Sequence, residues 1–152
     1  MWKRVGRDRQ REKVYRAERK FRDEIGCNYM LRDDEVKKLI RRLVGRSGLK
    51  VEVKFKNGDR FWARARRVMG ERYRVELPRW ARNEVVICHE LAHILAGLEN
   101  WHNGAFVSQM IKLYRRVAGR EKAEMLKKHF RAERVRVTGR GEKPIWVFKA
   151  GE

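Results

Sequence analysis

The chain has 152 residues, with 40 lysines and arginines against 20 acidic residues, so its formal net charge is +20. Hydrophobic residues make up 42% of the sequence and aromatic residues 10%, which excludes low-complexity disorder and predicts a folded core. At this length we expect one compact domain over residues 1–152. No apolar run is long enough to cross a bilayer and no apolar leader segment follows the first residues, so we expect a cytoplasmic protein without a membrane partner.

The positive charge is spread over the whole sequence and does not form a separate basic arm. A surface this basic attracts nucleic acid and other polyanions by counterion release, without reading any base sequence. The alternative is a strongly solvated surface that serves no nucleic-acid partner, and composition does not decide between the two. We expect the protein to be a monomer.

The first third of the chain predicts two amphipathic helices. Apolar residues three or four positions apart mark the first, over residues 7–24: Val14, Ala17, Phe21 and Ile25. The second begins at Asp33 or Asp34, either of which can cap it, and ends at Gly45 or Gly48.

Alternation with a period of two then predicts three strands, over residues 51–55, 61–65 and 73–77. Asn57-Gly58 between the first two is a strong hairpin signal, and Gly70 precedes the third. These features predict an antiparallel sheet in chain order.

Three further helices are predicted after the strands. Residues 83–98 are the most apolar segment and predict a buried helix, followed by helices over residues 104–118 and 120–131. Beyond them, residues 135–137 and 145–148 could form a terminal hairpin. The whole pattern predicts an α+β fold in which an antiparallel sheet packs against helices, with the helix of residues 83–98 at the centre.

The buried helix carries the sequence His89-Glu90-Leu91-Ala92-His93, an HExxH pattern. Two histidines four residues apart lie on the same helical face, so both rings can reach one zinc ion, and Glu90 can touch a water in its open position. Zinc lowers the pKa of such a water, while the carboxylate takes up and returns its proton. The alternative is a buried helix whose histidines are satisfied by hydrogen bonds alone.

A catalytic zinc needs a third protein ligand. His102 lies nine residues beyond His93, where a returning chain can offer its ring to the same ion. The other histidine, His129, stands among lysines and arginines and is predicted to lie on the surface. A distal glutamate, Glu121 or Glu124, is the alternative third ligand.

The sequence from His89 through Trp101-His102-Asn103-Gly104-Ala105-Phe106 resembles the SprT-like (Spartan-type) zinc peptidases, where the HExxH helix is followed by a histidine, a nearby glycine and a phenylalanine under the site. Residues 7–18 and 77–82 are similar to segments of small HExxH metallohydrolases of actinobacteria and their phages. The resemblance implies a minimal zincin-like fold, with His89, His93 and His102 as zinc ligands and Glu90 as general base. One departure is Asn103, which separates His102 from the glycine.

We therefore predict a zinc-dependent hydrolase, specifically a metallopeptidase acting on proteins or peptides, including proteins associated with nucleic acid. Its substrate would lie extended along a sheet edge between residues 51 and 77. The alternatives are a basic nucleic-acid-binding module with a structural zinc and a zinc-dependent phosphodiesterase or nuclease.

Several side chains are candidates for a supporting role, and their spacing assigns none of them. The residue types that can stabilise an oxyanion are Tyr73, Arg79, Arg82 and Tyr114, the last already counted as core. Trp101, adjacent to His102, is predicted to wall the metal site.

Overall fold

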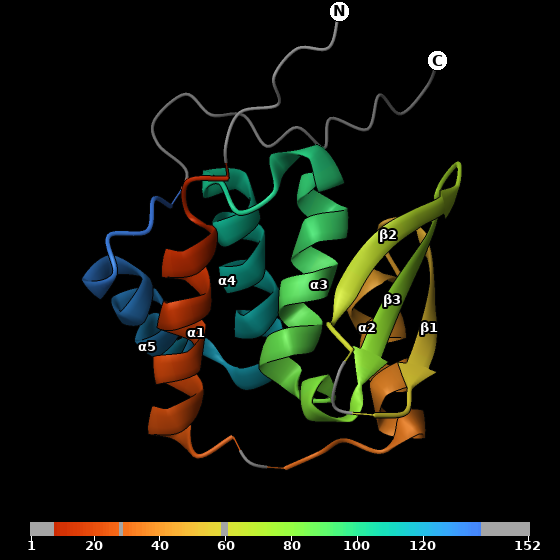
Figure 1. The fold of residues 1–152 in the computed structure, drawn as a ribbon, viewed down its shortest axis with the longest axis horizontal. Coiled ribbons are helices and arrows are strands. Elements are labelled where there is room, and N and C mark those ends of the chain that lie inside the picture. Colours follow the sequence, from red (N-terminus) through yellow and green to blue (C-terminus); the bar gives the residue numbers. More distant parts are fainter. Residues whose placement is uncertain (1–7, 28, 59–60, 138–152) are drawn as a thin grey trace, which may run out of the picture.

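The computed structural model describes residues 8–27, 29–58 and 61–137, which form an α+β fold of five α-helices and a three-stranded sheet (Figure 1). The helices are α1 (Arg11–Ile25), α2 (Asp33–Val44), α3 (Glu84–Ala96), α4 (Gly104–Ala118) and α5 (Arg120–Ala132). The strands are β1 (Lys50–Lys56), β2 (Arg64–Met69) and β3 (Arg72–Pro78). The α+β class and all five helices are confirmed. Of the predicted terminal hairpin, residues 135–137 are described and form no strand, and residues 145–148 lie outside the described residues.

The sheet is mixed, so the prediction of an antiparallel sheet in chain order is wrong. The strand order is β1-β3-β2, with β1 parallel to β3 and β2 antiparallel to β3. Asn57-Gly58 therefore starts a connection from one edge of the sheet to the other and not a hairpin. The true hairpin joins β2 to β3 at Gly70, where a φ of +54° suits a residue without a side chain.

The reason for this topology is the distribution of apolar residues between the strands. Strand β3 buries Tyr73, Val75 and Leu77, and a central position gives it a hydrogen-bonded neighbour on each side. Strand β2 is mostly exposed, which suits an edge. Alternation along a strand predicts which face each residue occupies, but it does not predict which strand lies beside it.

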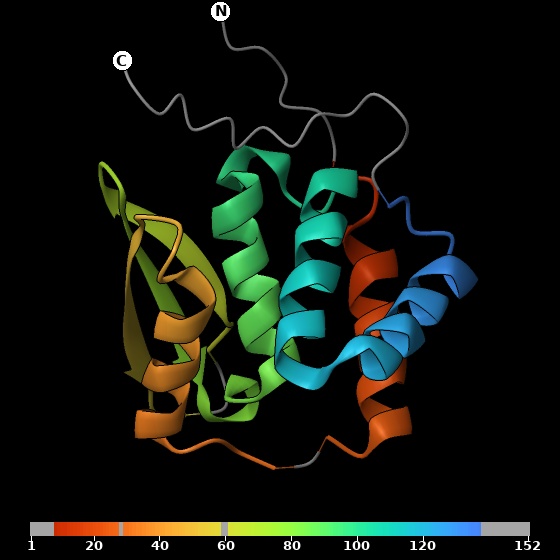
Figure 2. The ribbon, with the colours of Figure 1, turned by 180° about the vertical axis from the view of Figure 1, so that it is seen from behind.

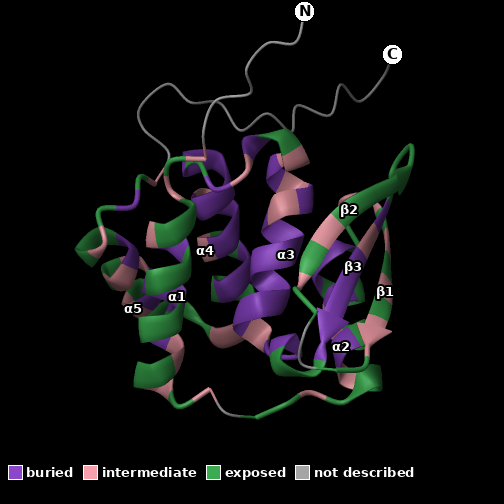
Figure 3. Cartoon of the chain, in the orientation of Figure 1, coloured by how far each residue is buried: buried purple, intermediate pink, exposed green. Residues whose placement is uncertain are grey.

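Helix α3 lies between the sheet and α4, while α2 covers one face of the sheet from behind (Figures 1 and 2). Helix α3 is capped by Asn83, whose side chain accepts a hydrogen bond from the backbone N–H of Val86. Ten of its 13 residues are buried, and purple runs along most of its length in Figure 3. No helix in the described part of the chain is long and apolar enough to span a membrane.

Helix α1 runs alongside α3 and α4 in Figure 1 and packs against α5, with Val14, Ala17 and Phe21 completely buried. Glu18 occupies the same buried stripe, with only 2% of its surface exposed. A carboxylate in such a position requires a partner, because burying an unpaired charge is costly. That partner lies on α3.

Candidate metal centre

The HExxH residues lie in the middle of α3, where the local sequence leaves them almost no contact with solvent. His89 is 2% and Glu90 4% exposed, and His93 is half-buried. The surrounding turns are apolar on every face, so these polar side chains must find partners with one another or with neighbouring elements.

His102 reaches the same place from the connection between α3 and α4. A short 3-10 helix (Leu98–Asn100) turns the chain after Gly97, and Asn103 then caps α4 by accepting hydrogen bonds from the N–H groups of Ala105 and Phe106. Asn103, the departure from the SprT-like pattern, thus fixes the start of α4 directly after His102.

The three imidazoles converge on one point. Nε2 of His89 lies 3.2 Å from Nε2 of His93 and 3.2 Å from Nε2 of His102. Within the described residues, these histidines form the one group of side chains placed to hold a metal ion, with their ligand atoms all within 4.8 Å of one another. Nitrogens bound to a tetrahedral zinc at about 2.0–2.1 Å are about 3.3 Å apart, so the observed spacing fits such an ion.

Two carboxylates hold the outer nitrogens of these rings. Nδ1 of His89 lies 2.6 Å from a carboxylate oxygen of Glu18, and Nδ1 of His102 lies 2.6 Å from one of Asp8. His93 makes a hydrogen bond with the backbone of Trp101. Carboxylates in these positions fix the tautomer and the orientation of a metal-binding histidine and raise its basicity.

With Nδ1 of His89 and His102 bonded to carboxylates, too few protons remain for hydrogen bonds among the Nε2 atoms that face one another. When Nδ1 of His89 and Nδ1 of His102 donate to their carboxylates, the Nε2 atoms carry lone pairs that face each other. A proton on Nε2 of His89 could bridge to only one of its two neighbours. A cation accepts all three lone pairs at once, so the donor set fits a metal ion better than a closed hydrogen-bond network.

Aromatic rings enclose the cluster from two sides. The Phe106 ring packs against all three imidazoles, with centroids 4.4–4.9 Å away, as the resemblance implied for this position. On the other side the Tyr15 ring stacks on His89 at 5.2 Å, with an interplanar angle of 18°. These contacts hold the imidazoles in a fixed orientation before any ligand arrives.

The environment perturbs the ionisation of the cluster. Burial and the neighbouring imidazoles lower the pKa of His93 to about 2, and the same causes lower the pKa of His102. Burial also acts to lower the pKa of His89, but Glu18 more than offsets it and the pKa is raised. Burial raises the pKa of Glu90 to about 7, against the opposing effects of the His89 charge and of a backbone hydrogen bond from Ala65. Neutral imidazole is the form that binds metal.

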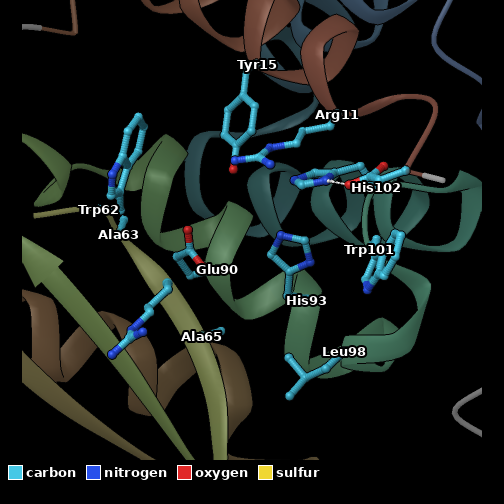
Figure 4. Close-up of a pocket in the computed structure, with 12 residues that line it drawn as sticks. Arg11, Tyr15, Trp62, Ala63, Ala65, Glu90, His93, Leu98, Trp101 and His102 are labelled. Carbon is cyan, nitrogen blue, oxygen red and sulfur yellow. Dashed lines mark hydrogen bonds and ion pairs between the residues drawn. The ribbon is translucent and has the colours of Figure 1, made fainter. Parts of the chain in front are cut away.

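Two adjoining hollows open over the cluster. The metal-side hollow, of about 470 Å³, is lined by His93, His102 and Trp101, and the α1-side hollow, of about 480 Å³, reaches Trp80 and Val86. Five residues line both: Arg11, Tyr15, Trp62, Ala63 and Glu90. Figure 4 shows the Glu90 carboxylate and the Tyr15 hydroxyl pointing into the same space, with the Trp62 ring beside it.

The other residues considered as metal ligands lie away from this site. Glu121 and Glu124 are exposed on α5, and neither belongs to the metal-binding group. His129 lies half-buried on the same helix, bonded to Glu24 of α1, and is also outside the group. The structure therefore brings together His89, His93 and His102, and leaves the two distal glutamates out.

The four residues considered as oxyanion stabilisers do not line either hollow. Tyr114 is buried against Phe21, and the Tyr73 hydroxyl accepts a hydrogen bond from Arg67. Arg82 is bonded to Asp33, and Arg79 is exposed. Trp101, by contrast, lines the metal-side hollow as predicted.

Sequence reasoning missed Asp8, Arg11, Tyr15 and Glu18, which all come from α1 or the residues just before it. One signal could have found Glu18, because it interrupts the apolar stripe between Val14 and Phe21 at a core-facing position. Tyr15 and Asp8 carry no comparable signal, since single polar and aromatic residues next to such a stripe are common.

No protein-family model, curated protein or solved structure matches this chain. The resemblance to SprT-like peptidases therefore stays a prediction. What the site can do follows from its geometry and chemistry.

Removing the charge of Glu18 tests whether it supports metal binding. We expect Glu18→Gln to lower the zinc affinity about 10- to 100-fold, because the amide holds the His89 ring without raising its basicity. The measurement is competition for zinc against a chromophoric chelator. Asp23→Asn, at an exposed position on the same helix that lines neither hollow, serves as the control and should leave the affinity unchanged. Equal affinities for the two variants would remove Glu18 from the site.

Proposed function

We propose that this protein is a zinc-dependent hydrolase of the zincin type that cleaves peptide bonds. The observation that carries the proposal is the convergence of three carboxylate- or backbone-supported imidazoles beside Glu90, at the floor of an open hollow. His89, His93 and His102 would hold the ion. Zinc held there would supply a Lewis acid and lower the pKa of a bound water towards neutrality.

Glu90 would move the proton in this reaction. Its side chain follows His89 on α3 and lines both hollows, so a water or a substrate amide in the hollow comes within its reach. The carboxylate accepts the proton of the attacking water and then donates it to the leaving amine.

Tyr15 and Arg11 would stabilise negative charge on the substrate oxygen. The Tyr15 hydroxyl points into the hollow, and the Arg11 side chain is hydrogen-bonded to Tyr15 (Figure 4). Both groups are donors, and both lie on α1, whose position is fixed by the buried Glu18–His89 bond. Donors held in advance near a developing oxyanion stabilise it without reorganising.

A peptide would reach this site along the start of β2. This strand is an edge of the sheet, and Ala63, Arg64 and Ala65 line the metal-side hollow. An extended peptide can add to such an edge through its backbone, which places a scissile bond near Glu90.

The two alternative functions have less support. A structural zinc would have four protein ligands, whereas the group found among the described residues has three and adjoins a hollow. Nucleases more often pair two metals through carboxylates, and the carboxylates of Glu18 and Asp8 are bonded to the outer nitrogens of the imidazoles.

Glu90→Gln tests the proposed general base. We expect the variant to fold and to bind zinc like the parent protein, while peptide hydrolysis falls by about 10²–10⁴-fold because the amide cannot accept a proton. Turnover of a quenched-fluorescent peptide library and of an unfolded protein, with and without a chelator, provides the measurement. A zinc-loaded parent protein that hydrolyses neither substrate would contradict the proposal.

Tyr15→Phe tests the oxyanion stabiliser separately. Removing one such donor lowers kcat by about 10²–10³-fold, and we expect this loss with zinc affinity unchanged. Tyr29→Phe is the matched control, because Tyr29 is exposed and lines neither hollow. If Tyr15→Phe turns over the substrate as fast as Tyr29→Phe, the hydroxyl has no part in the reaction.

A further inference from the structure

One face of the sheet has no covering element in the described part of the chain. Helix α2 packs behind the sheet and α3 lies at the β2 side, so the opposite face is open (Figures 1 and 2). Exposed and half-buried residues make up β1 and β2, as the green and pink colours in Figure 3 show. We call it the open face and define it by nine alternating positions: Lys50, Glu52, Lys54, Lys56, Arg64, Arg66, Arg72, Arg74 and Glu76.

The strand register and the ion pairs both place these side chains on one side of the sheet. Lys50 is opposite Arg72, Glu52 opposite Arg74 and Lys54 opposite Glu76 in the parallel pair, while Arg64 and Arg66 face Glu76 and Arg74 in the antiparallel pair. Arg74 also bonds Glu52 at 2.7 Å. Residues that pair in this way across neighbouring strands must project from the same side of the sheet.

The open face carries far more positive charge than its own carboxylates can neutralise. Seven of the nine positions are lysine or arginine, and the two carboxylates are Glu52 and Glu76. Glu76 is shared by Arg64, Lys56 and Arg66, which cover it so that 3% of its side chain is exposed. Within the described residues, Lys50, Lys54 and Arg72 make no ion pair and are exposed.

Like charges placed side by side on neighbouring strands destabilise a sheet, as at Lys50 opposite Arg72 and Arg66 opposite Arg74. Such a surface gains free energy when a polyanion supplies the missing negative charge. With strands about 4.8 Å apart and a rise of about 3.3 Å per residue, the face measures about 10 by 20 Å. A phosphodiester backbone presents charges at regular intervals over that length.

We propose that the open face docks a nucleic acid through its phosphate backbone. None of the nine positions is aromatic, and the exposed rings of Phe61 and Trp62 lie only at the end of the face marked by Lys56 and Arg64. Successive unpaired bases would therefore find no ring along the face, and duplex DNA is the favoured occupant. Binding is independent of base sequence, because lysine and arginine on a flat sheet contact phosphates and not base edges.

The open face also adjoins the candidate metal centre. Arg64 belongs to the face and lines the metal-side hollow, at the start of β2. A nucleic acid on this face would therefore lie next to the hollow that contains Glu90. The docking itself does not require the hydrolase activity, and the two proposals are tested apart.

The test compares two variants that each lose three positive charges. The face variant combines Lys50→Gln, Lys54→Gln and Arg72→Gln, and the control combines Lys112→Gln, Arg115→Gln and Lys128→Gln on α4 and α5, all six positions being exposed. Binding of a 16-base-pair duplex of arbitrary sequence is measured by fluorescence anisotropy from low salt to about 0.2 M. Circular dichroism confirms that both variants fold.

We expect the face variant to lose at least about tenfold in affinity near 0.15 M salt, and its slope of log affinity against log salt to become shallower by about 2–3, since each lost phosphate contact contributes about 0.9. The slope of the control variant should differ from the slope of the parent protein by less than about 1. Equal losses in the two variants would show that the charge acts diffusely and would overturn the proposal. Binding of poly-glutamate and of anionic vesicles is measured in the same way. If the face variant loses as much affinity for either of them as it loses for DNA, the assignment of nucleic acid as the occupant is overturned.

Discussion

Three imidazole nitrogens meet inside an apolar helix layer with too few protons between them, and this constraint organises the rest of the site. Nε2 of His89 has a neighbouring imidazole nitrogen 3.2 Å away on each side, while its outer nitrogen is bonded to Glu18. Buried lone pairs that face one another are unfavourable unless a cation or a donor intervenes. The same geometry matches the spacing of ligands around a tetrahedral ion.

Two carboxylates, one on α1 and one just before it, explain how this charged helix is held beside α3. Glu18 is buried, and its bond to His89 joins α1 to α3, while Asp8 before α1 holds His102. Tyr15, between them in sequence, covers the cluster and faces the hollow. One short segment thus supports two proposed ligands and supplies the proposed oxyanion donor.

The local parts of this arrangement could be predicted from the sequence, and the long-range parts could not. HExxH fixes His89, Glu90 and His93 through helical geometry alone, and the helix boundaries follow from apolar periodicity and caps. His102 was predicted because few other ligands exist, and Glu18 and Asp8 were missed because they contact residues 71 and 94 positions away. The strand order was wrong for a similar reason, since alternation specifies faces and the burial of β3 decides neighbours.

The central claim is that His89, His93 and His102 together hold one zinc ion. Elemental analysis of the full chain, loaded with zinc and dialysed, tests it most directly when His102→Ala and Glu124→Ala are compared with the parent protein. The account predicts about one zinc per chain for the parent protein and for Glu124→Ala, and loss of most of it for His102→Ala. A parent protein that retains no zinc, or a His102→Ala variant that retains as much as the parent, would contradict it.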